Sequence, residues 1–388
     1  MRLINVHCHV LNFKSIPDSF FRTRLPFREN IIRIPWVGSL VNFFFRKVWP
    51  GTKYDLIKEQ LELLGLSIDE VAKQLIDEMD EAQIDLAIPL MMDMETPKFD
   101  ESPEHPCNFQ AEYLADICVK QHFGRLIPFI MFDPRKPQAA SLCIRCLEEF
   151  GFLGVKIYPT LGFHPSHKSI CNNSYENKEL TILYEYCNAH RIPITAHCSP
   201  GGAYSFDLVR GEQVRYYFTR PEAWLEVLKS YPRLRLNLAH FGGNITVLDQ
   251  PTLNWGTRKV IQMIRDFDNV YADIAYHDEA QDVANVHGRQ TEYFKSFARI
   301  VEEEKVRSRV IFGTDWPMTR HTWTERMYCD SFRSHLSNDL MQSIGFANPL
   351  DFLFHNRIIP SRLIDFWQQH NKSHADLPDS IREATRSS

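Results

Sequence analysis

The fold is decided by a short unit that reads LGVKIYP at residues 153–159, KELTILYEYCNAH at 178–190 and IPITAHC at 192–198. The first and last segments are apolar runs of the kind found in strands that are buried on both faces. The middle segment has apolar residues at helical spacing. A strand, a helix and a second strand in this order predict two parallel strands joined by a crossover helix.

The same alternation continues on both sides of this unit. Apolar runs predict strands at residues 4–10, 85–92, 125–132, 153–159, 192–198, 234–240, 270–276 and 309–315. Helical patterns separate them, and the first helix begins after Ser67, with Glu70 completing a capping box. Eight such repeats predict an α/β fold, the closed (β/α)8 TIM barrel. The alternative is an open doubly wound sheet, but HCHVLNF stands where that fold has a glycine-rich turn.

The remaining segments are predicted to belong to the same domain, residues 1–388, since no linker or change of composition divides the chain. Residues 11–66 form a long aromatic-rich insertion after the first strand, where it could shape or cover a pocket. Its most apolar run, residues 34–45, is shorter than the roughly 20 residues of a membrane span. Residues 338–388 are predicted to be a C-terminal helical extension, with a polar end that frays from His370.

Composition narrows the class of protein. The chain has 388 residues, 44% of them hydrophobic, and a net charge of −5. A nucleic-acid partner is not expected, because such proteins usually present a basic face. Nine scattered cysteines suit a reducing compartment, and Cys143 and Cys146, although spaced C-x-x-C, fall in a helical pattern and are expected in the core. With no signal peptide before the first strand, the expected location is the cytoplasm, without a membrane span.

Polar side chains recur where the predicted strands end. These residues are His7, His9, Lys156, His197, His240 and Asp315. As residues i and i+2 of a strand, His7 and His9 face the same way, opposite Cys8. In a TIM barrel the carboxyl ends of all strands open on one rim, so we expect these side chains to converge there.

The residue types at this rim suit a metal ion. Three of these four imidazoles, together with the carboxylate, would form a ligand set for Zn²⁺, and also for Fe²⁺ or Mn²⁺. We therefore expect one divalent ion, with zinc as the first choice and one coordination position open for water. Such an ion lowers the pKa of its water toward neutrality, and a neighbouring histidine or carboxylate can hold or move the proton.

Each candidate also has a purely structural interpretation. The two histidines of the first strand could form an ordinary polar face, and His197 could be a hydrogen-bonded core residue. His240 could be a turn residue beside Phe241, and Asp315 could cap a helix or form a turn. Lys156 could pair with a neighbouring carboxylate.

Taken together and in order, the motifs resemble those of the amidohydrolase superfamily. They are the H-x-H of residues 7–9 followed by GVKIYP, PITAHC, YPRLRLNLAHFGG, NVYADIAY and VIFGTDWP, over residues 4–317. They are most similar to the amidohydrolase-related branch that includes aminocarboxymuconate-semialdehyde decarboxylase. The resemblance implies a metal-dependent TIM barrel in which His7, His9, His197 and Asp315 bind the ion. It also implies that His240 holds the attacking water or a carbonyl and that Asp315 accepts a proton.

The resemblance leaves the role of Lys156 open. Other branches of the superfamily carbamylate a lysine on the fourth strand to bridge two metals, so a second ion is expected only if Lys156 is carbamylated. An unmodified ammonium could instead orient a carboxylate or phosphate of the substrate.

Three functions remain open. The first is a metal-dependent hydrolase that attacks an amide, ester or lactone carbonyl of a small molecule. The alternative is a metal-dependent nonoxidative decarboxylase, a lyase, of a small unsaturated or aromatic carboxylic acid; the third is a barrel that has lost catalysis. The candidates for anchoring a substrate carboxylate are Arg210, Arg215 and Arg220, and those for lining the pocket are Tyr204, Tyr276, His277 and Trp316. A homo-oligomer is compatible with such a barrel, and the sequence does not decide it.

Overall fold

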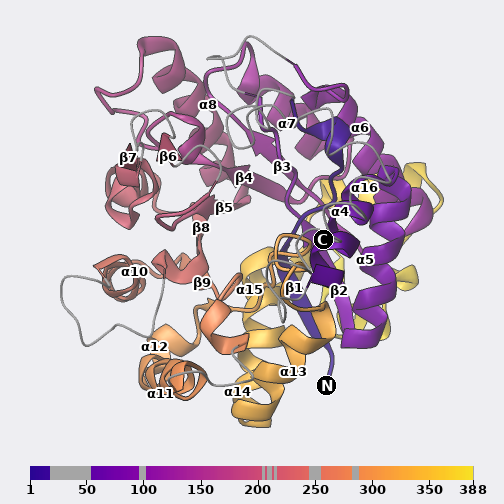
Figure 1. The fold of residues 1–388 in the computed structure, drawn as a ribbon. Coiled ribbons are helices and arrows are strands. Elements are labelled where there is room, and N and C mark those ends of the chain that lie inside the picture. Colours follow the sequence, from indigo (N-terminus) through magenta and orange to yellow (C-terminus); the bar gives the residue numbers. More distant parts are fainter. Residues whose placement is uncertain are drawn as a thin grey trace.

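In the described part of the chain, eight parallel strands form the centre of the molecule (Figure 1). A computed structural model describes residues 1–17, 54–95, 102–202, 206–207, 212–213, 216–243, 255–281 and 288–387. The strands are β1 (Leu3–Cys8), β2 (Ile84–Pro89), β3 (Phe129–Phe132), β4 (Gly154–Ile157), β5 (Pro193–His197), β8 (Arg235–Ala239), β9 (Val270–Asp273) and β10 (Val310–Ile311). One sheet pairs β1 with β2, and a second runs in the order β3-β4-β5-β8-β9-β10.

Backbone hydrogen bonds close both seams between these two sheets. The N–H of Ala87 in β2 donates to the Arg125 carbonyl, just before β3, at 2.9 Å. The N–H of Val6 in β1 donates to the Phe312 carbonyl, just after β10, at 3.0 Å. The predicted TIM barrel is therefore confirmed, and an open sheet with two free edges is excluded.

Helices lie outside the strands (Figure 1). They are α5 (Ile68–Ala82), α6 (Cys107–Asp116), η2 (Ile117–Gln121), α7 (Ala139–Glu149), α8 (Ser174–His190), α9 (Leu225–Ser230), α10 (Trp255–Asp266), α11 (Arg289–Glu302), α12 (Glu304–Arg307) and α13 (Glu325–His335). The predicted capping box starts α5, because Ser67 Oγ accepts from the Glu70 N–H while the Glu70 carboxylate accepts from the Ser67 N–H. Cys143 and Cys146 are buried in α7, as predicted.

Most of the insertion after β1 lies outside the described residues, including the apolar run 34–45. Its described ends are residues 11–17, which contain the short turn η1 (Phe13–Ser15), and the helix α4 (Tyr54–Leu64). Two antiparallel strands of two residues each, β6 (Phe206–Asp207) and β7 (Glu212–Gln213), pair in the loop after β5. Among the helices in the described ranges, none combines the length and the apolar character needed to cross a membrane.

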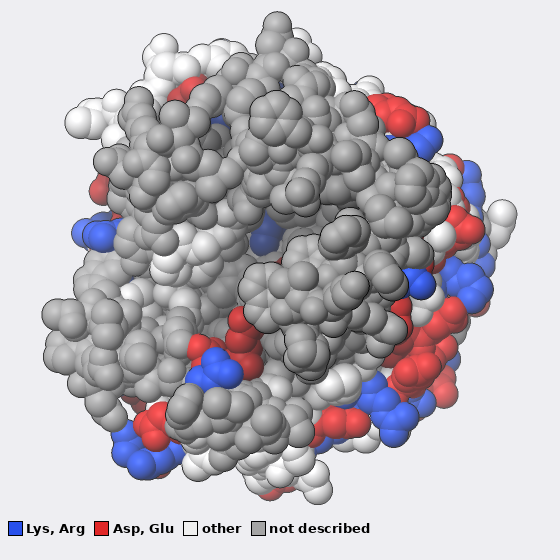
Figure 2. All heavy atoms as spheres, in the orientation of Figure 1, with Lys and Arg blue, Asp and Glu red and all other residues white. Residues whose placement is uncertain are grey.

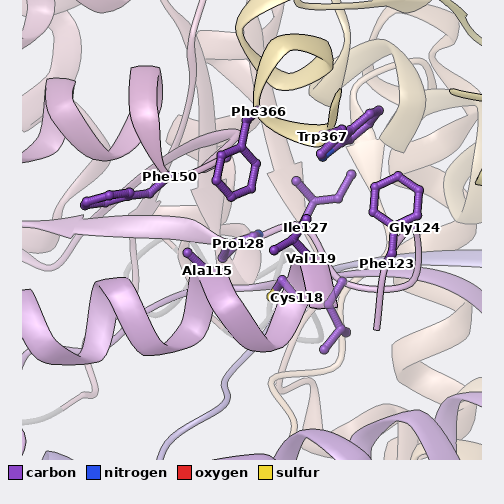
Figure 3. A pocket seen from close by; sticks show the side chains of 12 residues that line it. Ala115, Cys118, Val119, Phe123, Gly124, Ile127, Pro128, Phe150, Phe366 and Trp367 are labelled. Carbon is purple, nitrogen blue, oxygen red and sulfur yellow. The ribbon is translucent and has the colours of Figure 1, made fainter. Parts of the chain in front are cut away.

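The C-terminal extension packs beneath the barrel. It contains α14 (Asn338–Gln342), α15 (Asn348–Leu353), α16 (Ser361–Gln369), α17 (Asp379–Ala384) and the strand pair β11 (Ile358–Ile359) with β12 (Arg386–Ser387). One apolar cluster joins α15, α16 and α17 to Ile4 and Val6 of β1. Figure 3 shows Phe366 and Trp367 of α16 on one side of a small pocket, with Cys118 and Val119 on the other. The extension thus covers the end of the barrel opposite the predicted site.

The prediction that the chain frays from His370 is wrong. Leu377 and Ile381 are buried in the same apolar cluster, and residues 386–387 pair with β11. Leu377, before α17, and Ile381, within it, dock this short helix, and the polar composition around them concealed this signal.

Candidate metal centre

His7 and His9 turn toward the same carboxylate, as the alternation along β1 predicts. His7 Nε2 lies 3.4 Å and His9 Nε2 2.9 Å from Oδ1 of Asp315. Cys8, between them, is buried in the apolar core. His9 Nδ1 donates to the carbonyl of Leu90 at 2.6 Å, which fixes this ring with its Nε2 toward Asp315.

Asp315 reaches the two histidines because the chain bends sharply after β10. Its backbone has a φ of 68°, which is uncommon for a residue other than glycine. The successive N–H groups of Thr314 and Asp315 both donate to the His7 carbonyl, at 3.2 and 2.7 Å. Such two-to-one pairing is typical of a β-bulge, which re-aims a side chain next to a site. A Cβ at Gly313 would lie 2.8 Å from Cβ of His7, so glycine is needed for this close approach.

Asp273, at the end of β9, orients His7 by contacting Nδ1, the ring nitrogen that faces away from Asp315. Its Oδ2 accepts from His7 Nδ1 at 3.0 Å and from Asn237 Nδ2 at 2.7 Å. Its Oδ1 accepts from the N–H groups of His240 and Ala275, at 2.9 and 3.1 Å. Burial alone would raise the pKa of Asp273, but the interaction with His7 and these hydrogen bonds hold it well below the usual range.

The sequence motifs predict no role for Asp273, although the sequence carries a signal for one. A single carboxylate inside the apolar strand VYADIAY, residues 270–276, indicates a buried charge with a dedicated partner. In the structure that partner is His7, and a carboxylate behind a metal-binding histidine is a common device for fixing its tautomer.

His7 faces Asp315 with a neutral ring. Burial, followed by the charge of Lys156, lowers the pKa of His7 to about 4, so its ring is neutral at physiological pH. With its hydrogen on Nδ1, toward Asp273, His7 turns the lone pair of Nε2 toward the Asp315 oxygen. Interactions with His7 and His9 hold the pKa of Asp315 well below its usual range against the effect of burial. Ligand atoms of His7, His9 and Asp315 lie within 4.8 Å of one another, and this set fits a divalent cation.

His7, His240 and Asp273 form a second group with the same 4.8 Å spacing. This group suits a cation less well, because both oxygens of Asp273 already accept two hydrogen bonds each. The first group is therefore the better candidate for a metal site.

His197 pairs with His240 and joins neither group. Its Nδ1 lies 3.1 Å from His240 Nε2, and its Nε2 lies 2.8 Å from the Gly201 carbonyl. His240 Nδ1 donates to the Ala275 carbonyl at 3.0 Å, so His240 Nε2 is an acceptor. Burial, followed by the charges of His240 and Lys156, lowers the pKa of His197 well below its usual value. Ser199 Oγ lies 3.1 Å from His197 Nε2, so a neutral His197 can donate through Nδ1 to His240 and accept from the Ser199 hydroxyl.

Lys156 of β4 is buried inside the barrel, with Nζ 3.4 Å from His7 Nε2. Burial lowers its pKa to about 8, while Asp315 and Asp273 oppose this shift. Among the described residues, no carboxylate oxygen lies within the 4.0 Å that defines an ion pair with Lys156. The structural interpretation of Lys156 as half of a salt bridge is therefore not supported in this part of the chain.

The residues predicted to line the pocket fall into three groups. Tyr204, Arg210 and Arg215 lie outside the described residues. Arg220 is exposed, at the start of η5 (Pro221–Trp224). The third group contains Tyr276 and His277, which come soon after Asp273 in the chain, and Trp316, which follows Asp315 directly.

These three residues differ in their surroundings. Tyr276 is half-buried, packs edge-on against Trp323 and has a φ of 57°. His277 is buried, and its ring is engaged by the Tyr293 hydroxyl at 2.8 Å and the His240 carbonyl at 3.3 Å. Trp316 is fully buried in the core. The ring of His277 thus contacts the backbone carbonyl of His240. Of the three residues, only Tyr276 is partly exposed.

The rim of the barrel is only partly described. The segments left out mostly follow β1, β5, β8 and β9 in the chain. Figure 2 shows this face of the molecule, with a basic side chain visible near its centre. A TIM barrel with histidines and a carboxylate gathered on its rim has side chains that could bind a metal ion.

Comparison with known proteins agrees with this class of barrel. The family model described as amidohydrolase matches residues 4–354, and the chain belongs to the amidohydrolase family. The resemblance of the motifs is thus confirmed over nearly the whole chain. A search among curated proteins returned no match.

Solved structures with the same fold are only distantly similar in sequence. An uncharacterised TIM-barrel protein from Bordetella bronchiseptica is 17% identical, with a TM-score of 0.54 over 91% of this chain and 98% of that one. An amidohydrolase from Burkholderia multivorans is 10% identical, with a TM-score of 0.52 over 91% and 99%. The 5-carboxyvanillate decarboxylase of Sphingomonas paucimobilis is 12% identical, with a TM-score of 0.49 over 91% and 98%. At such identities the likeness to the first two structures shows the fold alone.

Proposed function

We propose that the protein is a metal-dependent hydrolase that attacks an amide, ester or lactone carbonyl of a small molecule. The observation that carries the proposal is the buried group of His7, His9 and Asp315, whose ligand atoms lie within 4.8 Å of one another. Asp273 adds to it, because its hydrogen bond to Nδ1 leaves the lone pair of the His7 ring on Nε2, the atom proposed as the ligand.

We assign His7, His9 and Asp315 as metal ligands and His197 as the fourth. Imidazole nitrogens with one carboxylate favour Zn²⁺, and one ion is proposed. When bound, the ion supplies Lewis-acid polarisation of the substrate carbonyl and lowers the pKa of water. The support for His197 is its position as the last residue of β5, and its lowered pKa, which keeps the ring neutral and able to act as a ligand.

Proton handling is assigned to side chains of the chain itself. His240 donates through Nδ1 to the Ala275 carbonyl, so its Nε2 can accept a proton from the attacking water. Asp315, ionised because its pKa is held low, is a second acceptor. His240, Tyr276 and Asp315 all have positive φ angles at the ends of three strands, and strained backbone of this kind gathers at functional sites.

Decarboxylation is retained as the second function because of Lys156. A buried ammonium without a carboxylate partner among the described residues could anchor the carboxylate of a substrate close to the proposed ligands. Carbamylation of the same lysine, with a second ion, is the competing role. Lys156→Met should raise KM for anionic substrates if the ammonium is the anchor, and mass spectrometry of the intact protein would detect the added CO2.

The experiment is a substrate panel with two readouts. Protein stripped of metal and reloaded with Zn²⁺, Mn²⁺ or Fe²⁺ is offered amides, esters, lactones and unsaturated or aromatic carboxylic acids, while released acid and CO2 are measured. We expect metal-dependent hydrolysis without CO2, loss of activity in Asp315→Asn and full activity in His355→Ala, an exposed histidine of the C-terminal extension. CO2 release would establish the lyase instead, and a metal-loaded protein inactive on the whole panel would contradict both functions.

A further inference from the structure

A buried carboxyl group joins α13 to the two segments that carry proposed ligands. Glu325, the first residue of α13, is 2% exposed. Its Oε1 accepts from Asn5 Nδ2 at 2.8 Å and from Thr314 Oγ1 at 2.9 Å. Asn5 Nδ2 also donates to Thr314 Oγ1 at 2.8 Å. The three side chains form a closed, buried triangle, here called the Asn5–Thr314–Glu325 triad.

The triad holds the backbone on both sides of the seam between β1 and β10. Asn5 Oδ1 accepts from the N–H of His7 at 3.1 Å and from the N–H of Thr314 at 3.2 Å. Thr314 Oγ1 accepts from the N–H of Trp316 at 3.3 Å. These N–H groups belong to one proposed ligand, His7, and to the two residues that flank a second proposed ligand, Asp315.

We propose that Glu325 is a positioning residue, which keeps His7 and Asp315 in ligand geometry by fixing Asn5 and Thr314. The inference rests on the proposed function, because it assigns Glu325 a role toward the proposed metal ion. No atom of Glu325 is itself assigned as a ligand.

The bend at Asp315 explains why the backbone of this segment has to be fixed by other side chains. A non-glycine residue at a φ of 68° tends to relax toward negative φ, and the paired N–H groups on the His7 carbonyl oppose this. Thr314 supplies one of those N–H groups, and its side chain is fixed by Glu325. Without Glu325, the Asn5 amide and the Thr314 hydroxyl would each lose a buried acceptor and could turn to other partners.

The nearby carboxylate of Glu78 favours the protonated form of Glu325. Glu78 accepts from Arg320 Nε at 2.7 Å and from the Glu325 N–H at 3.3 Å. Burial, together with the charge of Glu78, raises the pKa of Glu325 to about 8, so the side chain carries a proton at neutral pH. Glutamine has the shape of this protonated form and keeps an oxygen that can accept from both donors.

The test compares zinc affinity with stability in matched variants. Zinc dissociation constants of metal-free protein are measured by competition with a chelator, and Tm is recorded on the same samples. Glu325→Ala should weaken zinc binding about 10-fold or more, while Glu325→Gln should stay within about 3-fold of wild type. Ser331→Ala is the control, because Ser331 lies on the same helix and its buried hydroxyl donates to the Ala280 carbonyl, away from the ligands. It should lower Tm without changing zinc affinity.

The outcomes separate this inference from the proposed function. If Glu325→Ala lowers Tm but binds zinc like wild type, Glu325 is only structural and the inference is overturned. Should Glu325→Ala fail to fold, Thr314→Val removes the hydroxyl at similar volume and should weaken zinc binding likewise; unchanged affinity would again overturn the inference. Wild-type protein that binds zinc but turns over no substrate overturns the function alone, and protein that binds no zinc overturns both.

Discussion

Asp273→Asn should weaken metal binding more than it weakens the fold. The carboxylate of Asp273 accepts four hydrogen bonds, and an amide can replace only one of its two oxygens. If the new NH2 group faced the backbone N–H groups of His240 and Ala275, donors would face donors, and neither backbone N–H group could turn to another acceptor. The NH2 group should therefore take the other position, toward Asn237 and His7.

Both side chains at that position can adapt. Asn237 has an Oδ1 without a partner, so its amide can rotate and accept from the new NH2 group. His7 can accept only by moving its hydrogen from Nδ1 to Nε2, the atom that faces Asp315. The stability cost should be about 1–3 kcal/mol, the range for losing charged acceptors at buried donors. Metal affinity should fall about 10- to 100-fold, as is usual when the partner of a ligating histidine is removed.

The assay measures zinc affinity by chelator competition and stability by urea denaturation of metal-free protein. Asp133→Asn is the matched control, since Asp133 is also buried after a strand but pairs with Arg135. It should lose stability and keep its zinc affinity. An Asp273→Asn protein that binds zinc within about 2-fold of wild type would refute the tautomer argument.

Three further predictions follow from the same geometry. The double variant His7→Ala/His9→Ala should lose bound metal while the barrel still folds, and undiminished metal content with native circular dichroism would count against the ligand assignment. His240→Ala should keep the metal and lose turnover; normal turnover would remove His240 from the chemistry. Because the pKa of Glu325 is raised from 4.5 to about 8, its contribution to stability is complete below pH 4.5 and is lost as the pH rises through 8. The loss is on the order of 5 kcal/mol, and Glu325→Gln should flatten this decline when Tm is followed from about pH 5 to 9.

The strands and their order could be predicted because the signals that define them are local. Runs such as IPITAHC carry both the strand and the polar residue at its end, and parallel connection brings all such ends to one rim. His7, His9 and Asp315 therefore meet as expected from sequence alone. Whether they bind a metal stays a prediction.

The sequence could not reveal which neighbour each polar side chain selects. His197 was predicted beside the other ligands, whereas in the structure it contacts His240 and Gly201. His277 was predicted to line the pocket, but both of its ring nitrogens are engaged by buried protein groups. Asp273 was overlooked because its function depends on a hydrogen bond across 266 residues of chain. Such choices depend on bends and ring rotations that no short pattern encodes.

The central claim is that His7, His9 and Asp315 hold one cation. Anomalous X-ray diffraction at the zinc edge, on crystals of zinc-loaded protein, tests it most directly. The account predicts one strong peak about 2.0–2.2 Å from His7 Nε2, His9 Nε2 and an Asp315 carboxylate oxygen. A fully loaded crystal whose zinc peak lies away from these three side chains would contradict it.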